Sequence, residues 1–236
     1  MDKFGGDTTA IIAGASGLVG RSLTEQLLNE SAITKLHALV RHPLQIQNDK
    51  LNQIQDAELR ITQWDDNNTA PDFGFICLGT TIKQAGSKSA LAHVDYEMVC
   101  QVAQTMKLIG VKRIAVVSCY GANARSLSHY LRCKGRMEKT ILSMNFDRVV
   151  FVRPGPLAGE RIPPRKDEVI IGHLLRLVSP MMIGPLANFK PIEADNVARS
   201  MLFSLFQPHR TPADKYITLN TPQMNRLLQS YHFVSS

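Results

Sequence analysis

The sequence predicts a doubly wound α/β protein, with helices on both faces of a parallel sheet of six or seven strands and a small C-terminal elaboration. Short runs rich in β-branched residues alternate with segments of helical periodicity, as in strands joined by crossover helices. Residues 113–117 are almost continuously apolar, as expected of a strand buried on both faces. A glycine-rich turn at residues 14–20 separates the first such run from the first helical segment.

In the first half of the chain we expect four strands and two helices. The strands are expected at residues 8–13, 36–40, 59–62 and 73–78, the third being the weakest. One helix should follow the glycine-rich turn, from about residue 18 to 30. A longer helix is expected over about 88–109, where apolar residues recur every three or four positions: Leu91, Val94, Met98, Val102, Met106 and Ile109. Gly110 then stands where a helix C-cap belongs.

In the second half, strands at 113–117 and 148–152 flank a helix expected at about 126–144. Prolines then interrupt regular structure: Pro154, Pro156, Pro163 and Pro164. A short helix near 169–178, a helix over 193–206 and a last strand at 216–219 complete the pattern. Because no repeat or linker separates these segments, we expect one domain over residues 1–236. Substrate-side elaborations are expected at about 154–192 and 207–236.

Composition restricts the class of protein. The chain has 236 residues, 44% hydrophobic and 20% charged, which is typical of one soluble domain. No run of 18 apolar residues predicts a membrane span, and the first residues do not have the pattern of a secretory signal. The four cysteines do not cluster like metal ligands, so we expect reduced thiols, no metal site and a cytoplasmic protein. The net charge of +7 comes from scattered residues, and nucleic acid is not the expected partner.

The strongest local motif is the G-x-x-G-x-x-G turn formed by Gly14, Gly17 and Gly20. It follows an expected strand and opens an expected helix, which is the context of a dinucleotide-binding loop. The first glycine permits a tight turn, the second lets the backbone approach a pyrophosphate, and the third lets the helix pack on its strand. Amide groups and the helix dipole then attract phosphate. The alternative is a tight strand–helix turn with no ligand.

The end of the second expected strand bears on the choice of nucleotide. An acid there holds the ribose 2′-hydroxyl of NAD, whereas an arginine suits the 2′-phosphate of NADP. Here the strand ends at Val40 and is followed by Arg41, with no acid at the strand end. A guanidinium binds phosphate oxygens as a charged fork. NADP(H) is therefore the preferred cofactor and NAD(H) the alternative, unless Arg41 is a solvated surface residue.

A Y-x-x-x-K pair, Tyr130 and Lys134, lies on the helix expected at 126–144. Its four-residue spacing places both side chains on one helix face. A nearby ammonium group stabilises a phenolate, so we expect Lys134 to lower the pKa of Tyr130. Ser118 follows the 113–117 strand, at the edge where open α/β sheets bind ligands. Ser118 would bind a substrate oxygen while Tyr130 exchanges the proton. The alternative is a surface tyrosine beside a solvated lysine.

Together these residues resemble the short-chain dehydrogenase/reductase superfamily. The glycine spacing is similar to that of its extended and atypical branches. Residues 77–81, 93–96 and 153–157 resemble its small atypical members, which include the Tat-interacting oxidoreductase-like proteins. The resemblance covers about residues 8–220 and implies a Rossmann fold that binds NAD(P).

The resemblance also implies roles for particular residues. The cofactor loop would consist of Gly14, Ser16, Gly17, Leu18, Val19 and Gly20. The adenosine side would be lined by Leu78, Gly79 and Thr80. The nicotinamide and its ribose would contact Tyr130, Lys134 and Pro154. Many members carry an asparagine on the helix before the serine strand, and Asp95 stands there in this chain, a departure that bears on the proton relay.

The sequence thus predicts an NADP(H)-dependent oxidoreductase acting on a small carbonyl or alcohol, with Ser118, Tyr130 and Lys134 as the catalytic residues. Two alternatives stay open. One is a non-catalytic NADP(H)-binding regulator that senses redox state, and the other is an NAD(P)-dependent isomerase or epimerase. The tail is shorter than in sugar-nucleotide epimerases of the superfamily, which disfavours a bulky nucleotide-sugar substrate. The partner expected is a small molecule, with no membrane association, and a homodimer or protein partner is left open.

Overall fold

A seven-stranded sheet forms the centre of the computed structural model, which describes residues 8–61, 64, 69–158, 184–207 and 215–232. The strands are hydrogen-bonded in the order β3-β2-β1-β4-β5-β6-β9, and every pairing is parallel. They are β1 (Thr8–Ala13), β2 (Ile33–Val40), β3 (Leu51–Gln55), β4 (Phe73–Ile76), β5 (Arg113–Val117), β6 (Arg148–Arg153) and β9 (Tyr216–Asn220). The predicted doubly wound parallel sheet is confirmed.

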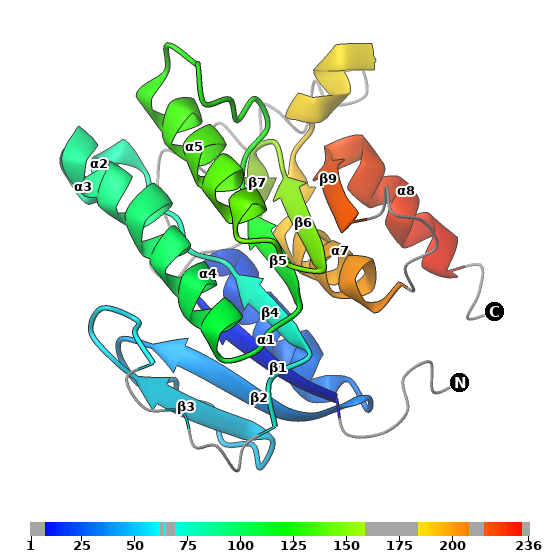
Figure 1. Cartoon of the computed structure of the whole chain (residues 1–236). Coiled ribbons are helices and arrows are strands. Elements are labelled where there is room, and N and C mark those ends of the chain that lie inside the picture. The colour runs from blue at the N-terminus through cyan, green and yellow to red at the C-terminus, as the bar shows by residue number, and fades with distance from the viewer. Residues whose placement is uncertain (1–7, 62–63, 65–68, 159–183, 208–214, 233–236) are drawn as a thin grey trace.

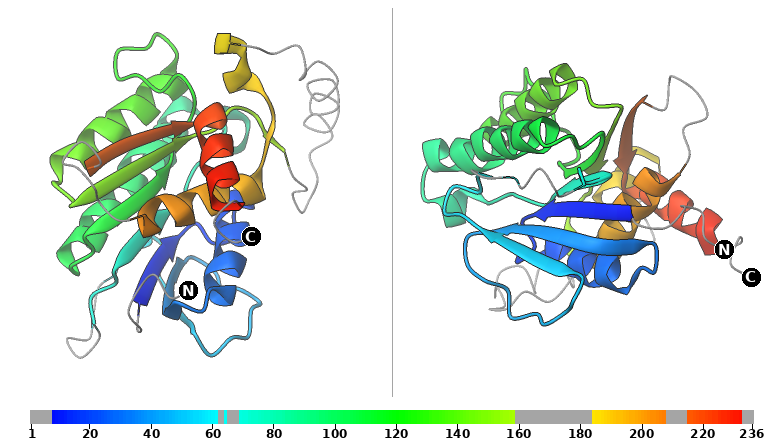
Figure 2. Two further views of the ribbon diagram at one scale, coloured as in Figure 1. Left: turned by 90° about the vertical axis from the view of Figure 1, so that its right-hand side faces the viewer. Right: turned by 60° about the horizontal axis from the view of Figure 1, so that its bottom comes forward.

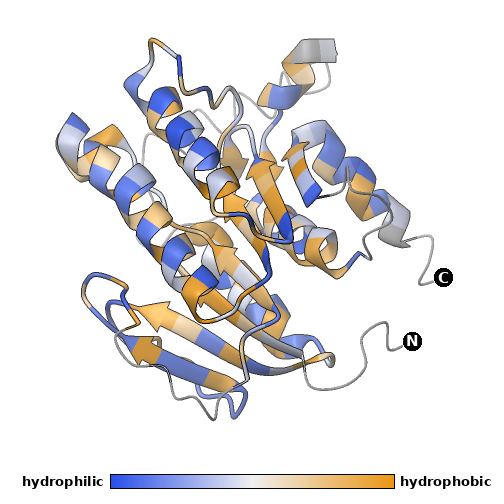
Figure 3. Cartoon of the chain, in the orientation of Figure 1, coloured by the Kyte–Doolittle hydropathy of each residue, from blue (hydrophilic) through white to orange (hydrophobic). Residues whose placement is uncertain are grey.

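Helices cover both faces of the sheet (Figures 1 and 2). On one face α1 (Leu18–Asn29) and α7 (Ala194–Phe206) share a buried apolar cluster with the strands. On the other face α4 (Val99–Leu108) and α5 (His129–Ser143) form a second cluster. The central strands β1 and β6 are almost wholly buried, because helices lie against both of their faces. Figure 3 shows the resulting pattern, with apolar strands inside and polar helix surfaces outside.

The third strand is not where the sequence predicted it. It is β3 at Leu51–Gln55, and residues 59–62 do not form a strand where the structure describes them. Leu59 has φ of 55°, which a strand does not allow. The carboxylate of Asp56 accepts the N–H groups of Glu58 and Arg60 and so forms a turn there. β3 is an edge strand with a polar composition, so it lacks the apolar run by which a buried strand is recognised.

The helix predicted over 88–109 contains a change of winding. It consists of α3 (Lys88–Ala92), the π-helical segment η1 (His93–Met98) and α4. Asp95 and Met98 of η1 are buried. Widened turns of this kind are rare and frequently occur at functional sites. Sequence periodicity predicted the extent of the helical region but not the π turn within it.

The C-terminal part adds elements around the ends of β5 and β6. A short parallel ladder joins β7 (Leu157–Ala158) to β8 (Ile192–Glu193). The 3-10 segment η3 (Gly184–Phe189) directly precedes β8. A further helix, α8 (Thr221–His232), was not predicted; Pro222 is its second residue, within a first turn that tolerates proline. The short α2 (Ile82–Ala85) follows β4. The helix predicted near 169–178 lies outside the described residues. Among the described helices, none has the length and apolar character needed to cross a membrane.

Candidate functional site

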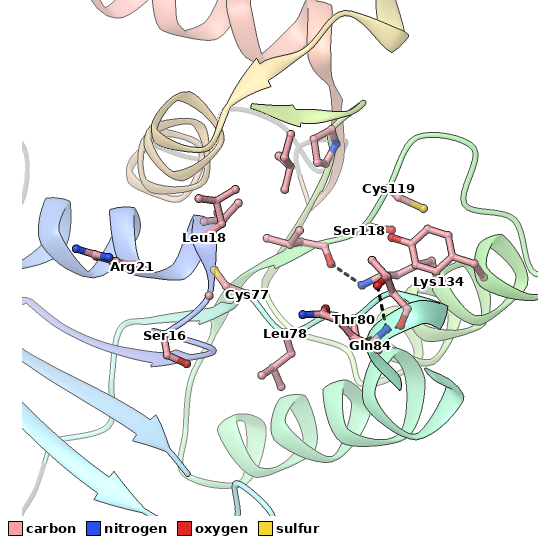
Figure 4. Close-up of a pocket in the computed structure, with 18 of the residues that line it drawn as sticks. Ser16, Leu18, Arg21, Cys77, Leu78, Thr80, Gln84, Ser118, Cys119 and Lys134 are labelled. Carbon is pink, nitrogen blue, oxygen red and sulfur yellow. Dashed lines mark hydrogen bonds between the residues drawn. The ribbon is translucent and has the colours of Figure 1, made fainter. Parts of the chain in front are cut away.

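A pocket of about 540 Å³ opens where the carboxyl ends of β4, β5 and β6 meet the loop after β1. The strand order reverses at this point, because β2 and β3 lie on one side of β1, whereas β4, β5 and β6 lie on the other side. Open α/β sheets bind ligands at such a switch point. The lining residues come from the glycine-rich turn, the loops after β4, β5 and β6, and α5 (Figure 4). They include Ser16, Gly17, Leu18, Val19, Arg21, Leu78, Gly79, Thr80, Ser118, Cys119, Tyr130, Lys134 and Pro154.

The glycine-rich turn has the geometry of a phosphate cradle. Gly14 has φ of +88°, and a Cβ there would lie 2.7 Å from the carbonyl carbon of Cys77. A Cβ on Gly20 would lie 2.0 Å from the carbonyl oxygen of Gly14, so a side chain at either position collides with backbone. Helix α1 begins directly after Gly17 with no side-chain cap and no acidic residue in its first turn. Its N-terminus therefore presents backbone amides and positive dipole charge to the pocket.

The predicted cofactor residues separate into three groups. Those that line the pocket are Ser16, Gly17, Leu18, Val19, Leu78, Gly79, Thr80, Tyr130, Lys134 and Pro154. Gly14 and Gly20 lie behind this lining and permit the tight packing of the loop. Arg41 is exposed at the end of β2 and outside the pocket lining, and its carbonyl oxygen accepts a hydrogen bond from Gln55. Arg21 of α1, which was not predicted, does line the pocket.

Lys134 forms a buried ion pair with Asp95. The ammonium nitrogen lies 2.8 Å from Oδ1 of Asp95, and the two side chains are 2% and 0% exposed. The ammonium also donates to the carbonyl oxygen of Val117 at 3.3 Å. Oδ2 of Asp95 accepts the backbone N–H of Thr80 at 2.9 Å. Asp95, the residue that departs from the superfamily pattern, is thus part of the site.

Tyr130 and Cys119 both line the pocket, and their side chains influence each other electrostatically. Burial raises the pKa of Tyr130, and the negative charges of ionised Cys119 and of Asp95 raise this pKa further. Burial also raises the pKa of the Cys119 thiol. The expected lowering of the Tyr130 pKa by Lys134 is therefore not the net outcome in this structure, because burial is the largest influence on this phenol and acts in the opposite direction.

Ser118 is buried and its hydroxyl donates to Oε1 of Glu138 at 2.5 Å. The same carboxylate accepts Nε of Arg153 at 2.8 Å, and its other oxygen pairs with the guanidinium. Burial and this bidentate contact fix the side chains of Glu138 and Arg153 beside Ser118, which follows β5. The single proton of Ser118 is directed at Glu138, so toward a ligand the hydroxyl can only accept a hydrogen bond unless it rotates.

The sequence reasoning therefore missed Glu138, Arg153, Cys119 and Arg21. Glu138 had a usable signal, since it follows Lys134 by four residues and lies on the same helix face. Arg153 had none, because its partner is on a distant segment. Within the part of the chain that the structure describes, no group of three or more potential ligands is placed to hold a metal ion.

Comparison with known proteins identifies one matching family and several related proteins. The model of a family described as NAD(P)H-binding matches residues 14–174. The chain is 27% identical to the protein "FMP52, mitochondrial" of Debaryomyces hansenii, over 94% of this chain and 99% of that protein. It is 29% identical to the protein HTATIP2 of Rattus norvegicus, over 85% and 82% of the two chains. With "FMP52-1, mitochondrial" of Scheffersomyces stipitis the identity is 33% over 65% and 69%.

Solved structures show the same fold at low identity. MoeE5 in complex with UDP-glucose and NAD superimposes with a TM-score of 0.63 and 16% identity, covering 95% of this chain and 80% of that one. A UDP-N-acetylglucosamine 4-epimerase from Methanobrevibacter ruminantium, in complex with UDP-N-acetylmuramic acid, gives 0.64 and 14% identity over 95% and 81%. At this identity the likeness concerns the fold.

The yeast relatives correct one expectation. Proteins of Debaryomyces hansenii and Saccharomyces cerevisiae are named as mitochondrial, which contradicts the expected cytoplasmic location. The expectation rested on the lack of an apolar export signal. That criterion does not separate the cytoplasm from the mitochondrion, because mitochondrial targeting segments are amphipathic and Arg-rich rather than apolar.

Proposed function

Because this chain belongs to the NAD(P)H-binding family and is an atypical short-chain dehydrogenase/reductase with a Rossmann fold, we propose that it is an NADP(H)-dependent oxidoreductase acting on a small carbonyl or alcohol. The observation that carries the proposal is one pocket lined both by the phosphate-type loop and by Ser118, Tyr130 and Lys134.

The pocket fits a dinucleotide by its backbone as well as by its composition. The turn at Gly14–Gly20 leaves room that a Cβ would fill, and the uncapped start of α1 supplies amide donors for a pyrophosphate. Arg21, which lines the pocket from α1, would add a charged donor on the phosphate side. Leu78, Gly79 and Thr80 would contact the adenosine, while Lys134 and Pro154 would lie at the nicotinamide end. When bound, a nicotinamide supplies or accepts the hydride.

Tyr130 would donate or accept the proton in the reaction, and its hydroxyl would act together with Ser118, which lines the same pocket. Its raised pKa keeps the phenol protonated at neutral pH, so the proton that a carbonyl undergoing reduction needs is present, although the same shift makes this phenol a weaker acid than an ordinary tyrosine. The hydroxyl of Ser118 donates its hydrogen bond to Glu138, so in this arrangement it would accept a hydrogen bond from a substrate hydroxyl. Donation to a substrate carbonyl would require the hydroxyl of Ser118 to rotate away from Glu138.

A second candidate is an isomerase or epimerase that uses its cofactor without net consumption. It is supported by the solved structures of similar fold, several of which are epimerases in complex with nucleotide sugars. Net oxidation of NADPH separates the two candidates, since an epimerase leaves the amounts of oxidised and reduced cofactor unchanged.

The test is NADPH oxidation, followed by its absorbance, against a panel of small aldehydes and ketones. A substrate turned over by the parent should be turned over ~10²–10⁴ times more slowly by Tyr130→Phe, the loss typical of a removed general acid. Tyr216→Phe, on the exposed edge strand β9, is the matched control and should retain the parent rate. Equal rates for the parent and Tyr130→Phe would exclude the assigned role, and no net oxidation with any carbonyl would favour the other candidate.

A further inference from the structure

Asp95 and Lys134 place two opposite charges inside the protein at the wall of the pocket. Their side chains are 0% and 2% exposed, with 2.8 Å between the charged groups. Removing two ions from water costs several kcal/mol each, which only close and well-bonded geometry offsets. A surface pair would be worth little. The burial of this pair therefore calls for an explanation in terms of the site.

Four separate segments fix the pair in place. Asp95 comes from the π-helical η1, where the widened turn places it in a buried position. Its second oxygen accepts the N–H of Thr80, in the loop after β4. Lys134 comes from α5 and also donates to Val117 at the end of β5. At Gly79 a Cβ would lie only 3.3 Å from Oδ1 of Asp95 and 3.5 Å from the Lys134 nitrogen, so the backbone packs directly against both charged groups.

Lys134, the cation of the pair, stands one helical turn after Tyr130 on α5. A free ammonium at this place would stabilise the phenolate, whereas an ammonium in contact with a carboxylate presents almost no net charge. On top of the proposed function, we propose that Asp95 is a positioning residue: its carboxylate holds the Lys134 ammonium as a fixed counter-ion, so that the ammonium does not act on Tyr130 as a free cation.

Other charged groups around Tyr130 do not replace the missing cation. The Cys119 side chain, from the loop after β5, lines the same pocket as the phenol. Glu138 and Arg153, near Cys119, are paired with each other. The pKa of Tyr130 is raised by burial first, then by the charge of ionised Cys119 and by that of Asp95. Beyond the effect of burial, Asp95 and its counter-ion Lys134 are therefore the charged pair whose removal should move this pKa.

The test measures the acidity of Tyr130 directly, without substrate or cofactor. The five tyrosines are replaced biosynthetically by 3,5-difluorotyrosine, an analogue with a more acidic phenol, so that titration falls where the protein is folded. Fluorine NMR follows each ring against pH, and the signal lost in Tyr130→Phe identifies the ring at 130. Asp95→Asn should lower the pKa of this ring by ~1–2 units, because it leaves the ammonium uncompensated.

Glu97→Gln is the matched control, since it removes an exposed carboxylate from the same π-helical turn and should not move this signal. If Asp95→Asn does not fold, two further variants give the same information. Lys134→Met leaves an unpaired carboxylate and should raise the pKa of the ring at 130, and Asp95→Asn/Lys134→Met removes both charges and should return it to the parent value.

Equal pKa values for this ring in the parent, Asp95→Asn and Lys134→Met would overturn the proposal. So would a rise in Asp95→Asn. These results do not depend on turnover: a protein without oxidoreductase activity can still show the expected shifts, and an active one can fail to show them.

Discussion

Ser118 shows how a side chain can lie at the expected place and still be engaged elsewhere. It follows β5 and lines the pocket, but its hydroxyl donates a hydrogen bond to Glu138. The charge of Glu138 is in turn balanced by Arg153. The local pattern of the sequence places the serine at a strand end. The direction of its hydrogen bond depends on α5 and β6 and emerges only from the assembled fold.

Two arginines, Arg21 and Arg41, are candidates for binding the phosphate groups of a cofactor. Arg21 lines the pocket but is more than half exposed and lies 3.5 Å from Glu25. Arg41 is exposed at the end of β2, beyond the lining, which is the side where a 2′-phosphate is read in this fold. A residue near the pyrophosphate acts on NADPH and NADH alike, whereas one that reads the 2′-phosphate acts on NADPH alone.

Arg41→Ala should therefore weaken NADPH binding by ~1.5–3 kcal/mol, the usual range for a hydrogen bond to a charged group, and leave NADH binding unchanged. Arg21→Ala is the matched comparison and should weaken both cofactors to a similar degree. Fluorescence titration of each variant with each cofactor measures these differences. Loss of NADPH selectivity in Arg21→Ala but not in Arg41→Ala would transfer the role to Arg21.

At the scale of elements, the sequence predicted what depends on local pattern. Buried strands such as β1 and β5 are mostly apolar, and the helix that carries Tyr130 and Lys134 has regular spacing, so both were placed correctly. The edge strand β3 was misplaced because half of it faces solvent. The π-helical turn of η1 was missed because the recurrence of apolar residues every three or four positions predicts that a segment is helical but not that one of its turns is wider.

The pairing of β2 with β3 creates a titratable element in the core. His37 of β2 is 1% exposed, stands opposite Asn52 of β3 and is hydrogen-bonded to it at 3.0 Å. The Trp64 ring lies 5.0 Å away. Burial, together with the charge of Lys35, lowers the pKa of His37 from 6.5 to about 4. The imidazole is thus neutral in the folded protein at pH values where it is protonated in the unfolded chain.

It follows that the free energy of unfolding should decrease as the pH falls from 6.5 toward 4, because the unfolded chain binds the extra proton in that interval. The contribution of His37 to this decrease is at most ~3 kcal/mol. Urea denaturation at several pH values measures it by comparing the parent with His37→Gln, in which this part of the decrease should be absent. Identical pH dependence in both proteins would show that His37 is not the group responsible.

For the whole molecule, the order of the parallel strands explains why one cavity gathers residues from positions 16 to 157 of the chain. The alternation of strands and helices predicted this topology, since parallel strands joined by crossover helices place all their carboxyl ends at one edge. The compartment was not predictable from the same pattern. The cytoplasmic expectation rested on the lack of an apolar export signal, a criterion that does not separate the cytoplasm from the mitochondrion, and the relatives named as mitochondrial contradict it.

Calorimetric titration of the purified chain with NADPH and, separately, with NADH tests the central claim most directly, because the claim is that the pocket beside Gly14–Gly20 holds NADP(H). We expect one NADPH to bind per chain, more tightly than NADH, and to raise the thermal unfolding temperature as its concentration exceeds the dissociation constant. Absence of saturable binding by either nucleotide in the folded chain, or tighter binding of NADH, would contradict it.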